Sequence, residues 1–433
     1  MAEGRPNILL IITHDTGRHL GCYGRPVETP HLDHLAEEGV QFAETYCTAP
    51  QCSPSRASLI TGLTPHQHGL VGLINKGFQM TPSIPHLPAL LAAGGYATHL
   101  FGIQHEARNA DELGYQVVHE AASRSCKDVA PRVVDFLDSA PQQPFFASVG
   151  FFETHRKFPD SPGPWDDVKV PEFLPNVPEV RHDVGDLNLS VKHVDDAVGA
   201  ILGALARSRF ADNTLVVYTT DHGIAFPGAK ATLFDPGIQI SLLVRGPRGF
   251  RGGKRVGAMV RNLDLFPTFL DLAGVTAPPN EGHSLIPLVD GSNSDWSDRI
   301  FTEMNYHVSY DPARGVRTRR YKYIRSFEPR PWWVAPNIDG GPRMQGYTKN
   351  WFRVNDPEVF TRPRPAELLF DLAEDPLERR NLADDVALRD VLGQLRQNVA
   401  DWMAATDDPL LNGVVPPQPG VDVTPPDHWE GAG

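Results

Sequence analysis

A cysteine stands directly before a predicted helix start in the segment APQCSPSRASLITG, residues 49–62. Ser53 is a favourable helix N-cap and Pro54 suits the first helical position, so Cys52 is expected at the amino end of this helix. Main-chain N–H groups and the positive end of the helix dipole favour a bound anion, or a lowered thiol pKa, at that place. Arg56, one turn further on, can point back and offer its guanidinium to the same anion.

Two pairs of polar residues follow apolar runs elsewhere in the chain. NILLIIT leads into His14-Asp15, and NTLVVYTT leads into Asp221-His222. Hard cations prefer oxygen ligands, so the carboxylates of Asp15 and Asp221 are candidates to hold one divalent cation. An oxyanion of a substrate would complete the ligand set.

The elements that must position these residues are predicted from apolar periodicity. Continuous apolar runs suit strands buried on both faces of a parallel sheet, and residues 183–208 have the spacing of a long amphipathic helix. Repeated strand and helix units predict an α/β fold with a large, mostly parallel sheet between helices. Ligands bind beyond the carboxyl ends of such strands. We therefore expect these polar strand ends to converge: His14-Asp15, His105, His155 and Asp221-His222.

The length of 433 residues predicts one large domain and a smaller one. After about residue 296, short predicted strands alternate with Pro- and Gly-containing loops, and residues 386–405 have the spacing of a helix. We predict a catalytic α/β domain over residues 1–295. A smaller α+β domain with an antiparallel sheet is predicted over residues 296–433, ending in an extended tail rich in Pro and Gly.

The net charge of −13 argues against nucleic acid or an acidic membrane as a general partner. The N-terminal residues contain neither an export signal nor a membrane span, so a cytoplasmic location is expected. Cys22, Cys47 and Cys126 lack the spacing of metal or disulfide motifs and are expected to be free, semi-buried thiols.

The pattern Cys52-x-Pro54-x-Arg56, followed by ASLITG and LTPHQHG, resembles the signature of the type I sulfatases of the alkaline phosphatase superfamily. RPNILLIITHD and TTDHG look like that family's metal-binding strands, and GAKATLFDPGIQISLLV looks like its lysine segment. VRTRRYKYI and LLFDLAEDPLERRNL look like hallmarks of its second domain. The resemblance covers nearly the whole chain. It implies an alkaline phosphatase-like fold and the hydrolysis of a small anionic substrate, a sulfate monoester or a sulfamate.

The resemblance also implies roles for individual residues. A formylglycine-generating enzyme oxidises the cysteine in this family, and one hydroxyl of the hydrated aldehyde then attacks sulfur while the other later expels sulfate. Histidine transfers protons readily near neutral pH. The expected catalytic residues are Cys52, Arg56, His105, His155 and Lys230. The expected metal ligands are Asp15, Cys52, Asp221, His222 and His14.

Three positions depart from the family pattern. His14 replaces an aspartate, His222 replaces an asparagine, and Ile103 in GIQH replaces a lysine. Imidazole ligands move the metal preference from Ca²⁺ towards Mn²⁺ or Zn²⁺. We expect one divalent cation, Ca²⁺ by resemblance, with Mn²⁺ as the main alternative. Sites of this kind also resemble choline sulfatases and formylglycine phosphonate monoester hydrolases.

The segments HDTGR and ETHR look closer to the heparan N-sulfatase (sulfamidase)-like branch of the family. Arg18 and Arg156 in these segments are expected to contact a sugar or a carboxylate of the substrate. Glu303 and His307 in FTEMNYH are expected to reach the pocket from the second domain, and His68 is expected to shape the helix that follows Cys52.

Two other functions are considered. Asp221-His222 is compatible with a phosphonate monoester or phosphodiester hydrolase that uses the same formylglycine chemistry. The altered metal pair and Ile103 are compatible with a protein that only binds sulfated glycans, but a binding protein has no need of the intact Cys52 motif. The sequence does not predict an oligomeric state.

Overall fold

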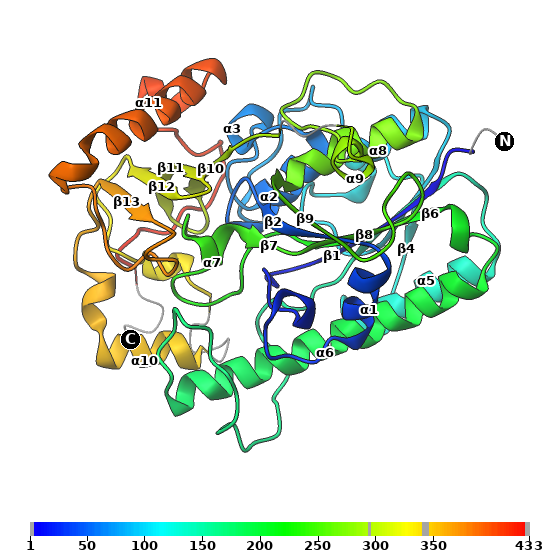
Figure 1. Ribbon diagram of the computed structural model, residues 1–433, viewed down its shortest axis with the longest axis horizontal. Coiled ribbons are helices and arrows are strands. Elements are labelled where there is room, and N and C mark those ends of the chain that lie inside the picture. The colour runs from blue at the N-terminus through cyan, green and yellow to red at the C-terminus, as the bar shows by residue number, and fades with distance from the viewer. Residues whose placement is uncertain (1–3, 293–295, 340–345, 429–433) are drawn as a thin grey trace.

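The computed structural model describes residues 4–292, 296–339 and 346–428, which fold around two sheets (Figure 1). Within these residues, nine strands make up the larger sheet. In spatial order they are β4 (Val117–His119), β3 (Ala97–Gly102), β5 (Phe145–Gly150), β1 (Asn7–Thr13), β6 (Thr214–Thr220), β8 (Leu242–Arg245), β2 (Val40–Tyr46) and β7 (Gln239–Ile240), with β9 (Lys254–Arg261) paired to β2.

Strand β1 lies in the middle of this sheet and is buried along its whole length. Leu9 and Ile11 belong to one hydrophobic core and Leu10 and Ile12 to another, as expected where successive side chains point to opposite faces. β1 runs parallel to both β5 and β6. The carboxyl ends of the three strands therefore lie at one edge of the sheet.

Helices cover both faces of the larger sheet, as predicted (Figure 1). One face is covered by α1 (Pro30–Glu38), α5 (Cys126–Asp138) and the long α6 (Pro178–Arg207). The other face is covered by α2 (Cys52–Thr61), α4 (Leu87–Ala93), α8 (Leu265–Ala273) and α9 (Ile286–Asp290). The α/β class of this part is confirmed. Short helices α3 (Pro65–His68) and α7 (Asp235–Ile238) lie in connecting segments.

The strands β2, β7, β8 and β9 are additions to the predicted sheet. β8 runs antiparallel to β6 and to β2, whereas β9 runs parallel to β2. The sheet is therefore mixed, although its central strands are parallel.

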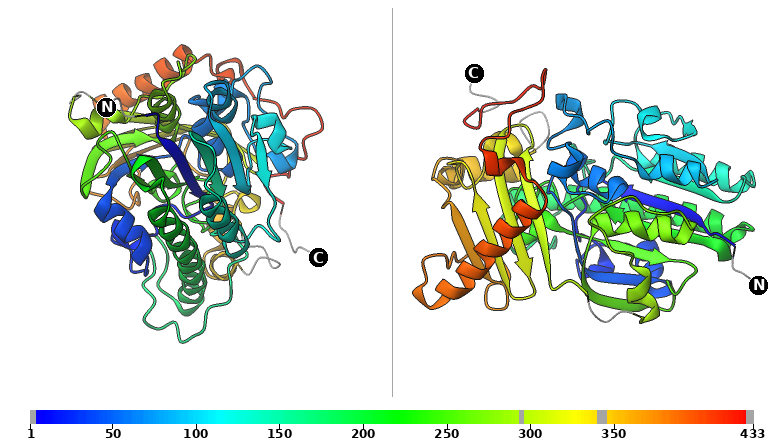
Figure 2. Two further views of the ribbon diagram at one scale, coloured as in Figure 1. Left: turned by 90° about the vertical axis from the view of Figure 1, so that its right-hand side faces the viewer. Right: turned by 90° about the horizontal axis from the view of Figure 1, so that it is seen from above.

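The second sheet contains β10 (Arg299–Tyr306), β11 (Tyr310–Thr318), β12 (Tyr321–Ser326) and β13 (Glu367–Asp371), all antiparallel. Helix α11 (Arg389–Ala405) packs on one face of it, and the other face packs against the larger part (Figure 2). A further helix, α10 (Tyr347–Asn355), contacts α6. The predicted antiparallel sheet is confirmed, while the domain boundary at residues 295 and 296 stays a prediction.

Beyond residue 413 the described tail contains neither helix nor strand and runs back towards the larger part. The main-chain N–H groups of Asp422 and Thr424 donate to the carbonyls of Lys76 and Val308. All four cysteines are free thiols. Among the described residues, we find no helix with the length and apolar character that a membrane crossing requires.

Candidate active site

Helix α2 places Cys52 at the carboxyl edge of the larger sheet. The helix begins at Cys52 itself, with Gln51 as the N-cap in an extended conformation. The expectation that Ser53 caps the helix is wrong, because its hydroxyl instead accepts the main-chain N–H of Ile74 at 3.1 Å. Every residue of α2 is buried, and Cys52 is 2% exposed.

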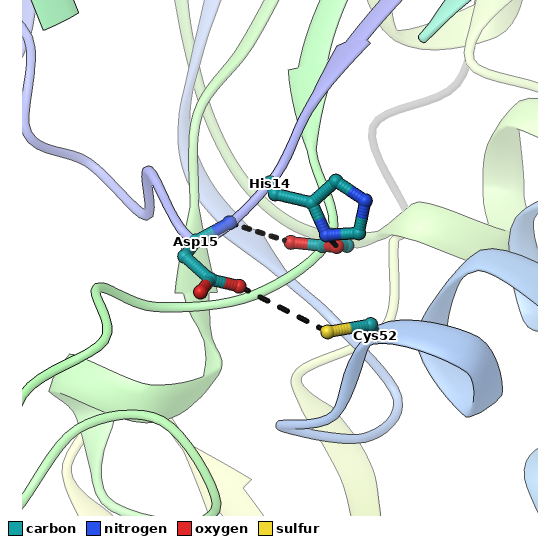
Figure 3. Close-up of side chains that lie close together, drawn as sticks. His14, Asp15 and Cys52 are labelled. Carbon is teal, nitrogen blue, oxygen red and sulfur yellow. Dashed lines mark hydrogen bonds and ion pairs between the residues drawn. The ribbon is translucent and has the colours of Figure 1, made fainter. Parts of the chain in front are cut away.

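Five side chains from three segments meet at this point and are here called the Cys52 cluster: His14, Asp15, Cys52, Asp221 and His222. The Sγ atom of Cys52 lies 3.9 Å from Oδ1 of Asp15 (Figure 3). It also lies 3.3 Å from Nε2 of His222. The same Oδ1 atom lies 3.2 Å from His222 Nε2. The convergence expected from the strand ends is therefore present in the structure.

The main chain turns sharply at Asp15, directly after β1. Asp15 has a φ of 49°, a left-handed conformation that aspartate adopts more readily than most residues. Its main-chain N–H donates to Oδ1 of Asp221 at 2.9 Å. This bond holds the carboxylate of Asp221 against the end of β1, which carries Asp15.

Two buried cations contact the carboxylates of the cluster. Lys230 Nζ lies 2.9 Å from Oδ2 of Asp15 and also contacts Asp339. Arg56 donates from Nε to Oδ2 of Asp221 at 3.0 Å, while its Nη1 has no hydrogen-bond partner among the described residues. Each carboxylate is thus held in one orientation by a fixed positive charge.

These contacts set the charges in the site. Burial opposes the charge on Lys230, but Asp15 and Asp339 outweigh it and hold the pKa of Lys230 well above its usual value. Burial raises the pKa of the Cys52 thiol well above its usual value, and Asp15 adds to the effect although Lys230 opposes it. The expected lowering of the thiol pKa by the helix end is therefore wrong for the unmodified cysteine.

The cluster has the donors that a divalent cation requires. His14 Nδ1 lies 2.9 Å from Oδ2 of Asp221, yet within the described part of the chain neither ring nitrogen of His14 has a partner with hydrogen-bond geometry. Burial, followed by the charge of Arg56, lowers the pKa of His14 well below its usual value, so the imidazole is neutral and keeps a lone pair. One ligand atom from each of four residues lies within 4.8 Å of the others: His14, Asp15, Cys52 and Asp221.

His222 is oriented by a second contact of its ring. Nδ1 lies 2.9 Å from the carbonyl oxygen of Gly223 and donates to it, so Nε2 is turned towards Asp15 and Cys52. A hydrogen bond of this kind on the remote nitrogen commonly orients a metal-binding histidine. His222 therefore has the orientation that a ligand needs.

A cavity of about 860 Å³ opens beside the cluster and is lined by His14, His105 and His155. The ring centroids of His105 and His155 lie 5.8 and 5.7 Å from that of His14. Burial lowers the pKa of His105 to about 3, and its Nδ1 has no hydrogen-bond partner. Ile103 also lines this cavity, where the family pattern has a lysine. We call this space the catalytic cavity.

Asp339 is a site residue that the sequence interpretation missed. Its Oδ2 contacts Lys230 and lies 3.9 Å from Nε2 of His155. Asp339 stands in a loop outside any periodic segment, so no pattern marks it. His307, which was expected to reach the pocket from the second domain, is buried. The charges of Asp339 and Lys230 act on its ring, so it lies near these two residues.

Two residues expected to bind substrate are engaged elsewhere. The guanidinium of Arg156 is buried and makes two hydrogen bonds, of 2.6 and 2.9 Å, to Asp183 of α6. Glu303 is buried against His66 and Arg314 at 2.9 and 3.2 Å. The assignment of both residues to substrate contacts is corrected, because internal ion pairs already hold their charged groups.

The structure also locates Arg18 and His68, two other residues that the sequence singled out. Arg18 lines a different cavity from the three histidines, and its Nη1 donates to Oε1 of Gln239 at 3.2 Å. His68 is fully buried, with Nε2 3.2 Å from the carbonyl oxygen of Pro54 and Nδ1 accepting the N–H of Leu70. His68 thus lies against α2, where it was expected to shape the helix.

Family models and a curated relative both match most of this amino-acid sequence. A family model described as Sulfatase matches residues 6–275, and one described as N-sulphoglucosamine sulphohydrolase, C-terminal, matches residues 226–342. The N-sulphoglucosamine sulphohydrolase of Homo sapiens is 30% identical, over 95% of this chain and 92% of its own length.

Two solved structures are similar along nearly the whole chain. A 2-O GAG sulfatase superposes with a TM-score of 0.75 at 23% identity and covers 99% of both chains. The phosphonate monoester hydrolase of Agrobacterium radiobacter superposes with a TM-score of 0.68 at 20% identity, over 93% of this chain and 96% of its own. At these identities the likeness concerns the fold.

Proposed function

The chain belongs to the sulfatase family and is a sulfuric ester hydrolase, and we propose that its substrate is a small sulfated sugar bearing a sulfate monoester or a sulfamate. The observation that carries this proposal is the position of Cys52. Its Sγ is within 3.9 Å of both the carboxylate of Asp15 and the imidazole of His222, in a cluster whose His14 lines a cavity large enough for a sugar.

We propose that Cys52 is converted to formylglycine by a formylglycine-generating enzyme. This group supplies the nucleophilic hydroxyl that attacks sulfur and the route by which sulfate leaves. Lys230 and Arg56 place two fixed positive charges at the carboxylates of the cluster, where they stabilise negative charge on the oxygens of the sulfate group.

His105 and His155 are assigned to proton transfer. Both line the catalytic cavity, and each ring lies within 5.8 Å of His14 between centroids. Burial lowers the pKa of His105 to about 3, so its ring is neutral, and the negative charge of a bound substrate would raise that pKa towards the range in which proton transfer is efficient. His155 lies 3.9 Å from the carboxylate of Asp339, which is placed to orient it towards the leaving group.

We propose that one divalent cation binds in the Cys52 cluster. The carboxylates of Asp15 and Asp221 would hold it together with His14 and His222, and it would supply positive charge to the oxyanion. The carboxylate oxygens suit Ca²⁺, which we place first, while the two imidazoles favour Mn²⁺ as the alternative.

The lining of the catalytic cavity supports a polar, anionic substrate. Arg108 and Arg124 are exposed at its wall, and Asn75 adds an amide group. Such side chains suit the hydroxyl and acidic groups of a sugar. Because the human relative is named for N-sulphoglucosamine, this sulfamate is the first compound to test.

The test compares four compounds at one pH with protein made together with a formylglycine-generating enzyme: N-sulfoglucosamine, an aryl sulfate, an aryl phosphodiester and phenyl phosphonate. We expect the highest kcat/KM on a sulfated compound, and none above background in Cys52→Ala. Intact-mass measurement before the assay establishes that the thiol has been converted. A kcat/KM that is highest on N-sulfoglucosamine would assign the sulfamate.

The second candidate is a phosphonate monoester or phosphodiester hydrolase with the same nucleophile. It is favoured by the imidazoles of His14 and His222 in the cluster. A kcat/KM on phenyl phosphonate above that on all sulfated compounds would replace our proposal with this one.

A further inference from the structure

A second cavity, of about 300 Å³, lies between the two sheets and shares no lining residue with the catalytic cavity. Gly17 and Ile224 of the larger part form one side, and Arg317 of β11 forms another. Its apolar walls consist of Pro171, Phe173, Ile224, Pro236, Leu372 and Leu377. Such walls suit the flat face of a small organic molecule.

Three guanidinium groups line this cavity, although the chain as a whole is acidic, with a net charge of −13. They belong to Arg18, Arg25 and Arg317, and the carboxylates of Glu172 and Asp235 line it with them. Asp235 is already neutralised, because Lys322 Nζ lies 2.5 Å from its Oδ1 and Arg317 lies 3.2 Å from its Oδ2. Glu378 and Glu44 also pair with Lys322 and Arg317, but among the residues that line the cavity three guanidinium groups stand against two carboxylates.

Arg18 is held in place by uncharged groups, and no carboxylate of the described residues pairs with it. Its guanidinium lies over the ring of Tyr23, 5.0 Å from the centroid, and donates to the amide oxygen of Gln239. Gln239 in turn donates from Nε2 to Asp235 at 2.9 Å. A cation positioned by an aromatic ring and a neutral amide keeps its charge for a further partner.

Arg25 lines the cavity with Arg18, and its guanidinium makes no hydrogen bond or ion pair with the described residues. Arg25 is exposed overall, yet desolvation of its guanidinium, followed by the charge of Arg18, lowers its pKa, while Glu172 opposes the shift. The Nε atom of Arg317, a residue 9% exposed, also has no hydrogen-bond partner among the described residues. Two guanidinium groups thus share one cavity with the carboxylate of Glu172, which offsets only part of their charge, so an added oxyanion would be favoured there.

We propose that this cavity is a second binding site, separate from the catalytic cavity, for a compact organic anion that has one carboxylate or sulfate group and an apolar ring face. Arg18 and Arg25 bind the oxyanion, and the apolar wall that contains Phe173 packs against the ring. The proposal does not depend on the reaction assigned to the Cys52 cluster.

Isothermal titration with benzenesulfonate and, separately, benzoate tests the site in the full-length protein. We expect binding with at least one probe, lowered about tenfold or more in Arg18→Gln and in Arg25→Gln, because each removes a charge-assisted hydrogen bond. The matched control is Arg132→Gln on the exposed face of α5, which should bind as the wild type does. A response to only one probe identifies the preferred head group.

Unchanged affinity and stoichiometry in both variants would overturn the proposal, as would the absence of binding by either probe to the wild type. Thermal melting of each variant establishes that it is folded before titration. Arg25→Gln removes no internal hydrogen bond, so it decides the outcome if Arg18→Gln does not fold. Arg25→Lys should recover part of the affinity, since it restores the charge but not the planar fork.

Discussion

The ammonium group of Lys230 lies 2.9 Å from Oδ2 of Asp15, and both side chains are buried at the carboxyl edge of the larger sheet. Replacing Lys230 with methionine should lower kcat on a sulfated substrate by about 10²–10³, the usual effect of losing one oxyanion-stabilising group. The measurement is steady-state kinetics on formylglycine-containing protein.

Lys230→Arg is the matched control, since it keeps the charge and should recover part of kcat. The mass of each variant must show the same degree of Cys52 conversion. If kcat of Lys230→Met stays within about twofold of wild type, the change is smaller than the loss of one oxyanion contact causes. Lys230 would then have no part in the mechanism.

Asp15 and Asp221 contribute two carboxylates to one buried cluster, so removal of the cation should abolish activity. We expect a chelator to reduce kcat to background and to lower the melting temperature, because like charges in the cluster lose their counter-charge. Adding back Ca²⁺ or Mn²⁺ to separate samples identifies the preferred ion. Activity that survives exhaustive chelation would contradict the metal assignment.

His222 should influence which cation is preferred. Its Nε2 faces Asp15 and Cys52, and an asparagine in its place would offer an oxygen instead of an imidazole. We expect His222→Asn to raise the ratio of Ca²⁺ to Mn²⁺ affinity, measured by titration of the metal-free protein. An unchanged ratio would mean that His222 is not a ligand.

Glu303 should matter for stability rather than for catalysis. It pairs with His66 and Arg314 inside the protein, and its pKa is lowered to about 2 because these cations outweigh the cost of burial. Glu303→Gln removes the carboxylate that pairs with His66 and one of the two that pair with Arg314, which keeps Asp408, and should reduce the free energy of unfolding by about 3 kcal/mol, the lower end of the cost of breaking a buried ion pair. Urea denaturation measures the loss, and kcat per folded enzyme should stay unchanged.

The exposed Glu358→Gln is the control for this change and should unfold as the wild type does. A large loss of kcat in Glu303→Gln at full stability would restore the substrate role that the sequence suggested.

The buried His68 should make the protein less stable in acid. Burial lowers the pKa of His68 to about 3, whereas an unfolded histidine titrates near 6.5. Between these values only the unfolded chain binds the proton, so stability is full above about pH 6.5 and falls as the pH falls. Its share of the loss is roughly 2 kcal/mol between pH 7 and pH 5.

His68→Gln should therefore show a shallower decline of unfolding free energy from pH 7 to pH 5. The exposed His34→Gln serves as the control and should decline as steeply as the wild type. Parallel declines in wild type and His68→Gln would contradict the lowered pKa.

The sequence predicted the centre of the site well, because simple rules govern it. Asp15 and Asp221 follow continuous apolar runs, and parallel strands bring such ends to one edge. Cys52 precedes residues that begin a helix, and α2 indeed begins there. The positions of these three residues could be predicted because each depends on the few residues next to it in the sequence.

The partners of charged residues could not be predicted in the same way. Arg156 pairs with Asp183 across 27 positions of sequence, and Glu303 pairs with His66 across 237. Nothing in the spacing of either residue indicates such a partner, since an ion pair depends on how distant elements pack. Asp339 was missed for the same reason, as its contact with Lys230 joins a loop to a segment 109 positions earlier.

Burial of Cys52 also imposes an order of events on its proposed conversion to formylglycine. The thiol is 2% exposed and is contacted by His222, a residue synthesised 170 positions later, while Lys230 follows later still. An enzyme that oxidises Cys52 must reach it before these segments close over it. Folding and oxidation therefore compete in time, so conditions that slow folding should increase the fraction of molecules that become active.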